Sequence, residues 1–185
     1  MEVKNFIKIY DNCLSPILIS KLISTINTFK FNEATIDKGE TNFEIRKTFT
    51  KSLNNLSSSM TEVHWHNLLY TIFTSALHRY GLDTKTQPFN FTNIINIDVL
   101  KYENSGFYTW HTDHFADCPR TMSCILLLNN DYEGGELCFR DVDGTNEWCV
   151  KKELGRIIVW PSNFMFPHTV KPVVGKRLSI VAWSL

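Results

Sequence analysis

Two histidines flank an aspartate in "HTDHF", residues 111–115. Residues two apart on a β-strand project from the same face, so this spacing predicts that His111 and Asp113 lie together if the segment is extended. An imidazole and a carboxylate on one face are typical ligands of a transition-metal ion. A third ligand has to come from another strand, and His168 in "FPHTVKPV" is the candidate. The alternative is a polar turn between two strands, without a metal.

An arginine in an apolar segment adds a second constraint. Arg177 follows His168 in "HTVKPVVGKRLSIVAW". A buried guanidinium without a partner is costly, so a buried Arg177 would need an anion. Its planar fork of N–H donors suits a carboxylate. Two histidines and one carboxylate, with open positions for a chelating cosubstrate, are typical of non-heme Fe(II) oxygenases. The alternative is an arginine at a strand end with its head in water.

The first half of the chain carries the helical patterns. Ser15 and Pro16 resemble an N-cap and a first helical residue, and aliphatic residues follow at helical spacing through residue 26. A second helix is predicted to begin near Met60 and to end at Gly81. The polar stretch between them, residues 31–42, is expected to be an exposed loop that could close over a site.

From residue 92 onward the pattern changes to short strands separated by turn residues. They are "TNIINIDVLKY", "FYTWHTD", "TMSCILLLN", "GELCFRDV", "EWCVKK", "GRIIVWP", "HTVKPV" and "RLSIVAWSL". Their connections are too short for crossover helices, which favours antiparallel sheets. We expect a mainly β fold with N-terminal helices (α+β) and a double-stranded β-helix, or jelly roll, as its core. Residues 1–185 would form one domain, with 1–91 as a helical and β support region and 92–185 as the catalytic core.

Composition restricts the possible partners. The chain has 19 basic residues (Lys and Arg) and 19 acidic residues (Asp and Glu), so its formal net charge is zero. General electrostatic binding to nucleic acid or anionic membrane is therefore not expected. The five cysteines include no C-x-x-C pair, which argues against a disulfide framework or a structural zinc site. The N-terminus lacks the apolar core of a signal peptide, and no apolar run could span a bilayer. These features predict a soluble, cytoplasmic protein.

Four segments in the second half carry a family resemblance. They are "LKYENSGFYTWHTDHF", "RTMSCILLLN", "YEGGELCF" and "GRIIVWPSNFMFPHTVKPVVGKRLSIVAW". In this order, they resemble the 2-oxoglutarate- and Fe(II)-dependent dioxygenases, specifically the prolyl 4-hydroxylase-like branch. The resemblance covers residues 93–185, and the first half adds only compatible helices.

The resemblance implies a role for each matching residue. His111, Asp113 and His168 would be the catalytic iron ligands, Arg177 and Tyr102 would bind 2-oxoglutarate, and Tyr108, Arg120 and Trp183 would lie near the substrate. Many prolyl hydroxylases have a tyrosine at the position of Leu127, where it helps to bind the cosubstrate. Arg177 would therefore depend on Tyr102 or on a hydroxyl group such as that of Ser123.

The implied reaction is hydroxylation of peptidyl proline by O2, coupled to conversion of 2-oxoglutarate into succinate and CO2, with ascorbate supporting turnover. A protein or peptide would be the substrate. The alternatives are a free amino acid, another small molecule or an alkylated nucleobase. Nucleic-acid demethylases of this type usually carry a second arginine six residues after the first, where this chain has Trp183. A more remote alternative is a non-catalytic jelly roll that binds a metal, a sugar or a protein.

Overall fold

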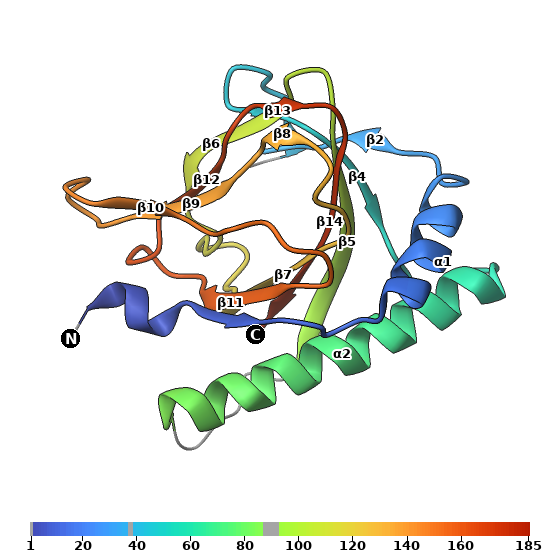
Figure 1. Ribbon diagram of the computed structural model, residues 1–185, viewed down its shortest axis with the longest axis horizontal. Coiled ribbons are helices and arrows are strands. Elements are labelled where there is room, and N and C mark those ends of the chain that lie inside the picture. Colours follow the sequence, from blue (N-terminus) through green and yellow to red (C-terminus); the bar gives the residue numbers. More distant parts are fainter. Residues whose placement is uncertain (1, 37–38, 87–92) are drawn as a thin grey trace.

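The computed structural model describes residues 2–36, 39–86 and 93–185 of the chain. In these residues two α-helices, one short 3-10 helix and many short strands form the fold (Figure 1). The helices are η1 (Val3–Phe6), α1 (Pro16–Ile26) and α2 (Met60–Thr84). The strands are β1 (Lys8–Tyr10), β2 (Asn32–Glu33), β3 (Arg46–Lys47), β4 (Phe49–Ser52), β5 (Ile94–Tyr102), β6 (Phe107–His111), β7 (Met122–Leu127), β8 (Glu133–Gly134), β9 (Leu137–Arg140), β10 (Glu147–Cys149), β11 (Ile157–Pro161), β12 (His168–Val170), β13 (Val173–Val174) and β14 (Arg177–Ser184).

Both predicted helices are confirmed. The Ser15 hydroxyl accepts a hydrogen bond from the backbone N–H of Leu18, which caps α1 at its N-terminus. In the same way, the Ser59 hydroxyl accepts from the N–H of Glu62 at the start of α2. The predicted end of α2 is slightly wrong, because the helix continues through Gly81 to Thr84. It is then closed by Lys85 in the left-handed conformation, with φ 55°.

Two large antiparallel sheets and one small one carry the second half of the described chain. The largest has seven strands in the order β1-β11-β7-β14-β5-β4-β2, the next has five in the order β10-β9-β12-β6-β3, and the third pairs β13 with β8. Every segment predicted to be a strand contains one. The structure therefore confirms a mainly β fold with helices in the first half.

The first half also contributes strands, and their positions were not predicted from the sequence pattern. β1, β2 and β4 extend the seven-stranded sheet, and β3 extends the five-stranded one. The polar stretch 31–42, expected to be a loop, contains β2, which pairs with β4. Residues 37–38 of this stretch lie outside the described residues.

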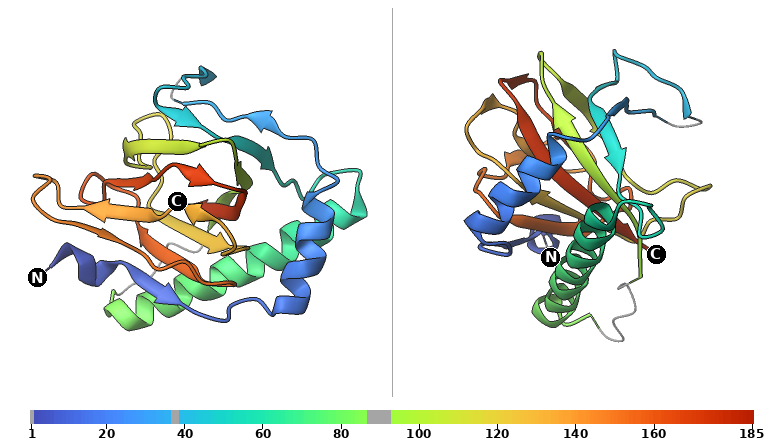
Figure 2. Two further views of the ribbon diagram at one scale, coloured as in Figure 1. Left: turned by 45° about the horizontal axis from the view of Figure 1, so that its top comes forward. Right: turned by 90° about the vertical axis from the view of Figure 1, so that its right-hand side faces the viewer.

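The seven-stranded sheet has two different faces. On its outer face, α1 and α2 pack against apolar side chains of β5, β7, β11 and β14 to form one core (Figure 2). On its inner face, aromatic and aliphatic side chains meet those of β9 and β12 in the five-stranded sheet and form a second core. Except for Arg177, the site residues predicted from the sequence line one cavity on this inner side.

One expectation about the cysteines is wrong. Cys138 of β9 and Cys149 of β10 form a disulfide bond. The two residues are direct partners in the β9–β10 register, which brings their Cα atoms to 3.9 Å, a proximity that an odd cysteine count does not reveal. Cys13, Cys118 and Cys124 are free thiols.

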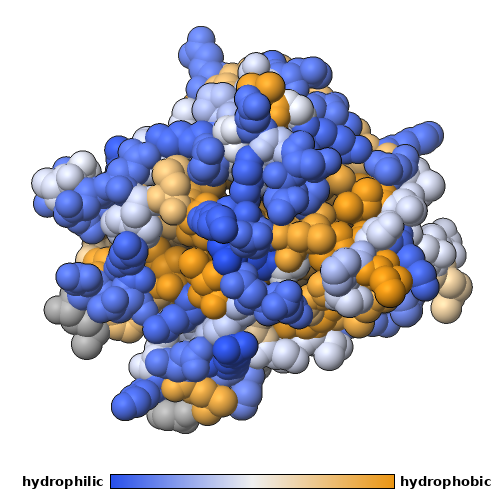
Figure 3. Space-filling view, viewed as in Figure 1, coloured by the Kyte–Doolittle hydropathy of each residue, from blue (hydrophilic) through white to orange (hydrophobic). Residues whose placement is uncertain are grey.

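The helices also bear on whether the described residues could span a membrane. Among the residues that the structure describes, neither α-helix combines the length and apolar character needed to cross a bilayer. The face seen in Figure 3 has hydrophobic areas interrupted by hydrophilic side chains.

Candidate active site

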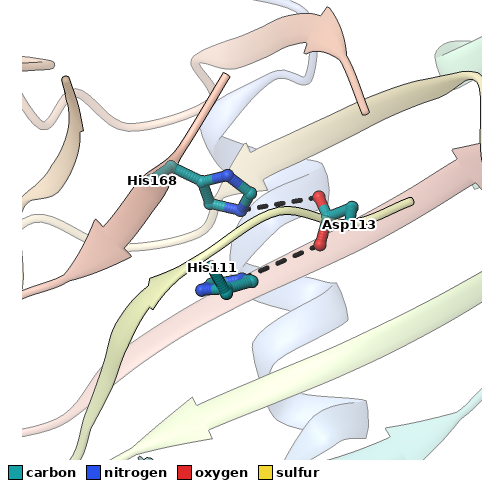
Figure 4. A group of neighbouring side chains, drawn as sticks. All are labelled: His111, Asp113 and His168. Atoms are coloured by element: carbon teal, nitrogen blue, oxygen red, sulfur yellow. Dashed lines mark ion pairs between the residues drawn. The ribbon is translucent and has the colours of Figure 1, made fainter. Parts of the chain in front are cut away.

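The residues of the "HTDHF" motif meet the second predicted histidine between the two sheets. His111 is the last residue of β6, and His168 is the first residue of β12 and its register partner. Asp113 lies two residues beyond the end of β6, so its place depends on the turn and not on strand alternation. Figure 4 shows both imidazoles pointing toward the Asp113 carboxylate. Its oxygens lie 3.7 Å from Nε2 of His111 and 3.5 Å from Nε2 of His168.

Backbone contacts orient both imidazole rings. Nδ1 of His111 lies 2.8 Å from the carbonyl oxygen of Thr109, and Nδ1 of His168 lies 3.1 Å from that of Phe166. A carbonyl oxygen only accepts, so each Nδ1 carries a proton. The Nε2 atom of each ring then faces the carboxylate, which is the usual orientation for a histidine that binds a metal.

The protonation states of His111 and Asp113 suit a cation. Burial, with the neighbouring His168, lowers the pKa of His111 to about 3, so this ring is neutral at physiological pH. Burial alone would raise the pKa of Asp113, but the two imidazoles and a hydrogen bond from Ser123 outweigh it and lower the pKa. Asp113 is therefore an anion that is only 5% exposed.

Two serines hold the Asp113 carboxylate. The Ser123 hydroxyl donates to Oδ2 of Asp113 at 2.6 Å and lies 2.8 Å from the Ser162 hydroxyl. Ser123 comes from β7, and Ser162 directly follows β11, the register neighbour of β7. The sequence analysis offered the Ser123 hydroxyl as one alternative partner of the cosubstrate, whereas in the structure this hydroxyl donates to Asp113. Ser162 was not predicted, because its approach depends on strand pairing.

The cluster fits a divalent metal. Its candidate ligand atoms all lie within 4.8 Å of one another. The N–O distances of 3.5 and 3.7 Å are longer than ordinary hydrogen bonds, and they leave room for one ion to be shared. Imidazole nitrogens and an ionised carboxylate are donors that iron accepts. The second candidate cluster, Cys138, Glu147 and Cys149, has its two sulfurs joined in the disulfide.

Arg177 lies in the sheet that faces His168, at the start of β14, and is only 1% exposed. Its Nη1 donates to the Ser179 hydroxyl at 2.9 Å. Its Nε and Nη2 are buried and have no hydrogen-bond partner among the described residues. Two unpaired N–H groups on one buried guanidinium are costly, and a carboxylate ligand would satisfy both of them.

A glycine turn gives the Arg177 side chain its space. Gly135 has φ +65°, and a Cβ there would come within 3.2 Å of Cδ of Arg177 and 2.8 Å of a Val173 methyl group. Any other residue would thus be strained in its backbone and crowded against the arginine. The "GG" of "YEGGELCF" therefore shapes the environment of Arg177.

The residues around Arg177 show how a cosubstrate carboxylate could be bound. Tyr102 is the register partner of Arg177, and its ring centre lies 5.1 Å from the guanidinium carbon. Leu127 is the register partner of Ser179, so an aliphatic side chain lies where a tyrosine was expected from the family. The hydroxyl that contacts Arg177 is that of Ser179, which the sequence did not single out.

A cavity of about 390 Å³ opens beside the histidines, and Tyr102, Asp113 and Trp160 are among its lining residues. All three predicted substrate residues, Tyr108, Arg120 and Trp183, also line it. The Tyr108 ring stacks on His111 with centroids 3.5 Å apart, and the Arg120 guanidinium lies 3.8 Å from the centre of the Trp183 ring. Arg177 itself is not among the lining residues, although its neighbour Tyr102 is.

Comparisons with known proteins agree with this geometry. Residues 97–185 match the 2OG-Fe(II) oxygenase superfamily. A PKHD-type hydroxylase of Idiomarina loihiensis is 32% identical over 95 residues, which cover 49% of this chain and 42% of that protein. Human prolyl 3-hydroxylase 2 is 39% identical over 66 residues, which cover 35% of this chain and 9% of that protein. The chain thus spans less than half of the length of these relatives.

Solved structures extend the similarity over nearly the whole chain. A Trichoplax adhaerens prolyl hydroxylase, solved in complex with a hypoxia inducible factor peptide fragment, aligns with a TM-score of 0.78 at 15% identity and covers 98% of this chain and 84% of that one. A Pseudomonas putida prolyl-4-hydroxylase aligns with a TM-score of 0.74 at 21% identity and covers 97% and 92%. These similarities establish the fold. In sequence, residues 97–185 are thus similar to the 2OG-Fe(II) oxygenase superfamily, and in fold the chain is similar to prolyl hydroxylases.

Proposed function

We propose that this protein is an Fe(II)- and 2-oxoglutarate-dependent hydroxylase that acts on peptidyl proline and releases succinate and CO2. The observation that carries the proposal is the pairing of two incomplete sites between the sheets. One is the His111, Asp113 and His168 cluster, whose donor atoms lie within 4.8 Å of one another. The other is the buried Arg177, whose Nε and Nη2 have no hydrogen-bond partner in the described part of the chain. A metal ion would complete the first site, and a carboxylate would complete the second.

Each residue has a distinct task in this proposal. His111, Asp113 and His168 hold Fe(II), and Arg177 binds the distal carboxylate of 2-oxoglutarate. Together with O2, the bound iron and cosubstrate supply the oxidising power for hydroxylating an unactivated C–H bond. Ser123 fixes the orientation of Asp113 through its 2.6 Å hydrogen bond. Ascorbate is the reductant we expect to sustain turnover.

The architecture supports the same proposal. We infer that the two facing antiparallel sheets form a double-stranded β-helix and that residues 1–185 act as one domain. Three strands of the first half pair into the larger sheet, which makes the first half part of the same sheet system. The inner faces of the sheets then exclude water from the metal ligands with Trp160, Phe139 and other aromatic side chains.

Proline is favoured as the target for two reasons. Several similar proteins are named prolyl hydroxylases, among them the Pseudomonas putida structure and human prolyl 3-hydroxylase 2. In addition, the cavity beside the histidines has aromatic walls at Tyr108 and Trp183, which suit an apolar ring. A peptide or protein is therefore the proposed partner.

Mass spectrometry of a cell lysate tests the target residue. The lysate is treated with the protein, Fe(II), 2-oxoglutarate and ascorbate, and peptides that gain one oxygen are scored against a parallel treatment with the His111→Ala variant. Gain on proline that depends on His111 is the expected result. Gain on another residue would contradict the choice of proline and keep the reaction type. Succinate without any modified peptide would instead favour a free amino acid, another small molecule or a nucleobase.

A further inference from the structure

One part of the inner face of the seven-stranded sheet is unexpectedly polar. Thr50 and Ser52 of β4 and Asp98 of β5 all line the cavity beside the iron ligands. Ser52 and Asp98 are register partners, and Asp98 is also paired with Val181 of β14. Thr50 and Asp98 are half-buried and Ser52 is exposed, so these polar side chains lie at the open side of the cavity. A carboxylate and two hydroxyl groups are therefore within reach of a molecule that enters the cavity.

The hydrogen bonds of this polar wall are incomplete. The Ser52 hydroxyl donates to Oδ1 of Asp98 at 2.6 Å. Among the described residues, Asp98 has no other hydrogen bond and no salt bridge, and the buried Thr50 hydroxyl oxygen has no partner at all. Oδ2 of Asp98 and the Thr50 hydroxyl thus remain available to a molecule in the cavity.

The described cations nearby are engaged elsewhere. Arg46 and Arg120 line the same cavity, but their guanidinium carbons lie 4.6 Å from the Tyr108 ring centre and 3.8 Å from the Trp183 ring centre. Arg46 also donates to the carbonyl oxygen of Thr35 at 3.0 Å. The Asp98 carboxylate consequently faces the cavity without a positive partner in the described part of the chain.

The charge of the site selects what can bind there. In the proposed complex, the metal and Arg177 would balance Asp113 and the cosubstrate carboxylates, and Arg46 and Arg120 bring positive charge to other parts of the cavity wall. Selection therefore depends on local contact with Asp98, which attracts a cation and repels an anion that comes close to it. Hydroxyl groups at Ser52 and Thr50 can accept the additional N–H bonds of an ammonium group.

We propose that Asp98, with Ser52 and Thr50, binds a protonated nitrogen of the substrate and thereby determines which prolines are hydroxylated. This rests on the proposed function, and it names the substrate class as a proline that adjoins a positive charge. The charge can come from a basic side chain near the proline in a peptide or from the ring ammonium of free L-proline. Asp98 contacts neither the metal cluster nor Arg177 in the structure.

Paired probes test the inference. The peptides are blocked at both ends and contain one proline, with lysine or norleucine at each neighbouring position in turn; norleucine keeps the aliphatic chain and lacks the ammonium group. L-proline and N-acetyl-L-proline amide form the second pair, which separates the two sources of charge. For each probe, kcat/KM is measured with Fe(II) and 2-oxoglutarate, and Kd is measured calorimetrically without oxygen.

In the wild-type protein, the charged member of at least one pair is expected to be preferred about 10- to 100-fold. Asp98→Asn keeps the size of the side chain and removes its charge, so the preference disappears while affinity for the metal and 2-oxoglutarate is unchanged. Asp143→Asn, on the exposed β9–β10 turn, is the matched control and keeps the preference. An equal preference in Asp98→Asn, or no preference in the wild type, would overturn the inference.

Failure of the inference and failure of the proposed function give different results. Proline oxidation without a preference for charge would reject the role of Asp98 and keep the hydroxylase. If no proline is oxidised, the proposed proline specificity fails. The oxygen-free Kd values then still decide whether Asp98 selects a cation.

Discussion

The two faces of the seven-stranded sheet differ in what their side chains do. On the outer face, β14 places Leu178, Ile180 and Ala182 against the helices. On the inner face, the alternate residues of the same strand include Arg177 and Ser179, which are buried as well. Strand alternation thus assigns one set of residues to stability and the other to chemistry. The comparison teaches that burial alone does not identify a core residue here, because Arg177 and Ser179 are as buried as the apolar residues that pack against the helices.

Removal of the metal ligand Asp113 is expected to have the largest effect. Asp113→Ala leaves two imidazoles without the carboxylate, so Fe(II) and Mn(II) affinity should fall below detection while the protein remains folded. Calorimetric titration with Mn(II) measures the affinity, and circular dichroism checks the fold. Unchanged Mn(II) binding would contradict the assignment of the inner face to metal chemistry.

Truncation of an outer-face residue should lower stability and leave metal affinity unchanged. Leu126 of β7 is fully buried against the helices, so Leu126→Ala should lower the free energy of unfolding by about 2–5 kcal/mol. Metal affinity of the folded fraction should be unchanged. Urea denaturation measures the loss of unfolding free energy. A change in Mn(II) affinity at low urea would contradict the claim that the outer face serves stability and the inner face serves metal binding.

Replacement of Arg177 should weaken the cosubstrate without destabilising the protein. Arg177→Met removes two charge-assisted hydrogen bonds to a carboxylate, so 2-oxoglutarate affinity should fall about 100-fold. Because the guanidinium has two unpartnered N–H groups among the described residues, the variant should be at least as stable as the wild type without cosubstrate. Arg177→Lys is the control that keeps the positive charge and loses the planar set of N–H donors. A large loss of stability in Arg177→Met would indicate a structural arginine.

Loss of the Ser123 hydroxyl should have a smaller effect on the metal. Ser123→Ala removes the 2.6 Å hydrogen bond to Asp113, and metal affinity should fall about tenfold. Ser179→Ala is the matched variant on the same face, and it should weaken 2-oxoglutarate while leaving Mn(II) affinity intact. The opposite pattern would show that the two serines have been assigned to the wrong partners.

The smallest effect is expected for Glu62, a residue of α2 that accepts a hydrogen bond from Lys51 of β4. Burial would raise the pKa of Glu62, but hydrogen bonds from Lys51, the Asn54 N–H and Ser57 lower it. A lowered folded-state pKa stabilises the protein above the ordinary carboxyl pKa, and this contribution is lost as pH falls through the folded value. Glu62→Gln should therefore cost about 1 kcal/mol at pH 7 and progressively less below pH about 4.5. A pH-independent difference between the two unfolding curves would reject this anchor.

Much of this arrangement could be predicted from local sequence. The helix start at Ser15 and the β-rich second half depend on short-range patterns, and the spacing of His111 and Asp113 marks them as ligand candidates. The short strands of the first half could not be predicted, since β3 has two residues and no periodicity and depends on its pairing with β6. The Ser123–Ser162 contact and the Cys138–Cys149 bond likewise arise from strand register.

The most direct test of the central claim is an anaerobic titration of the protein with Fe(II) and 2-oxoglutarate, followed by visible absorption. The wild type should develop an absorption band that requires both additions. The band should be absent in Asp113→Ala and should need much more 2-oxoglutarate in Arg177→Met. An unchanged band in Asp113→Ala would contradict the proposed iron site, and no band in the wild type despite bound iron would favour a non-catalytic metal-binding fold.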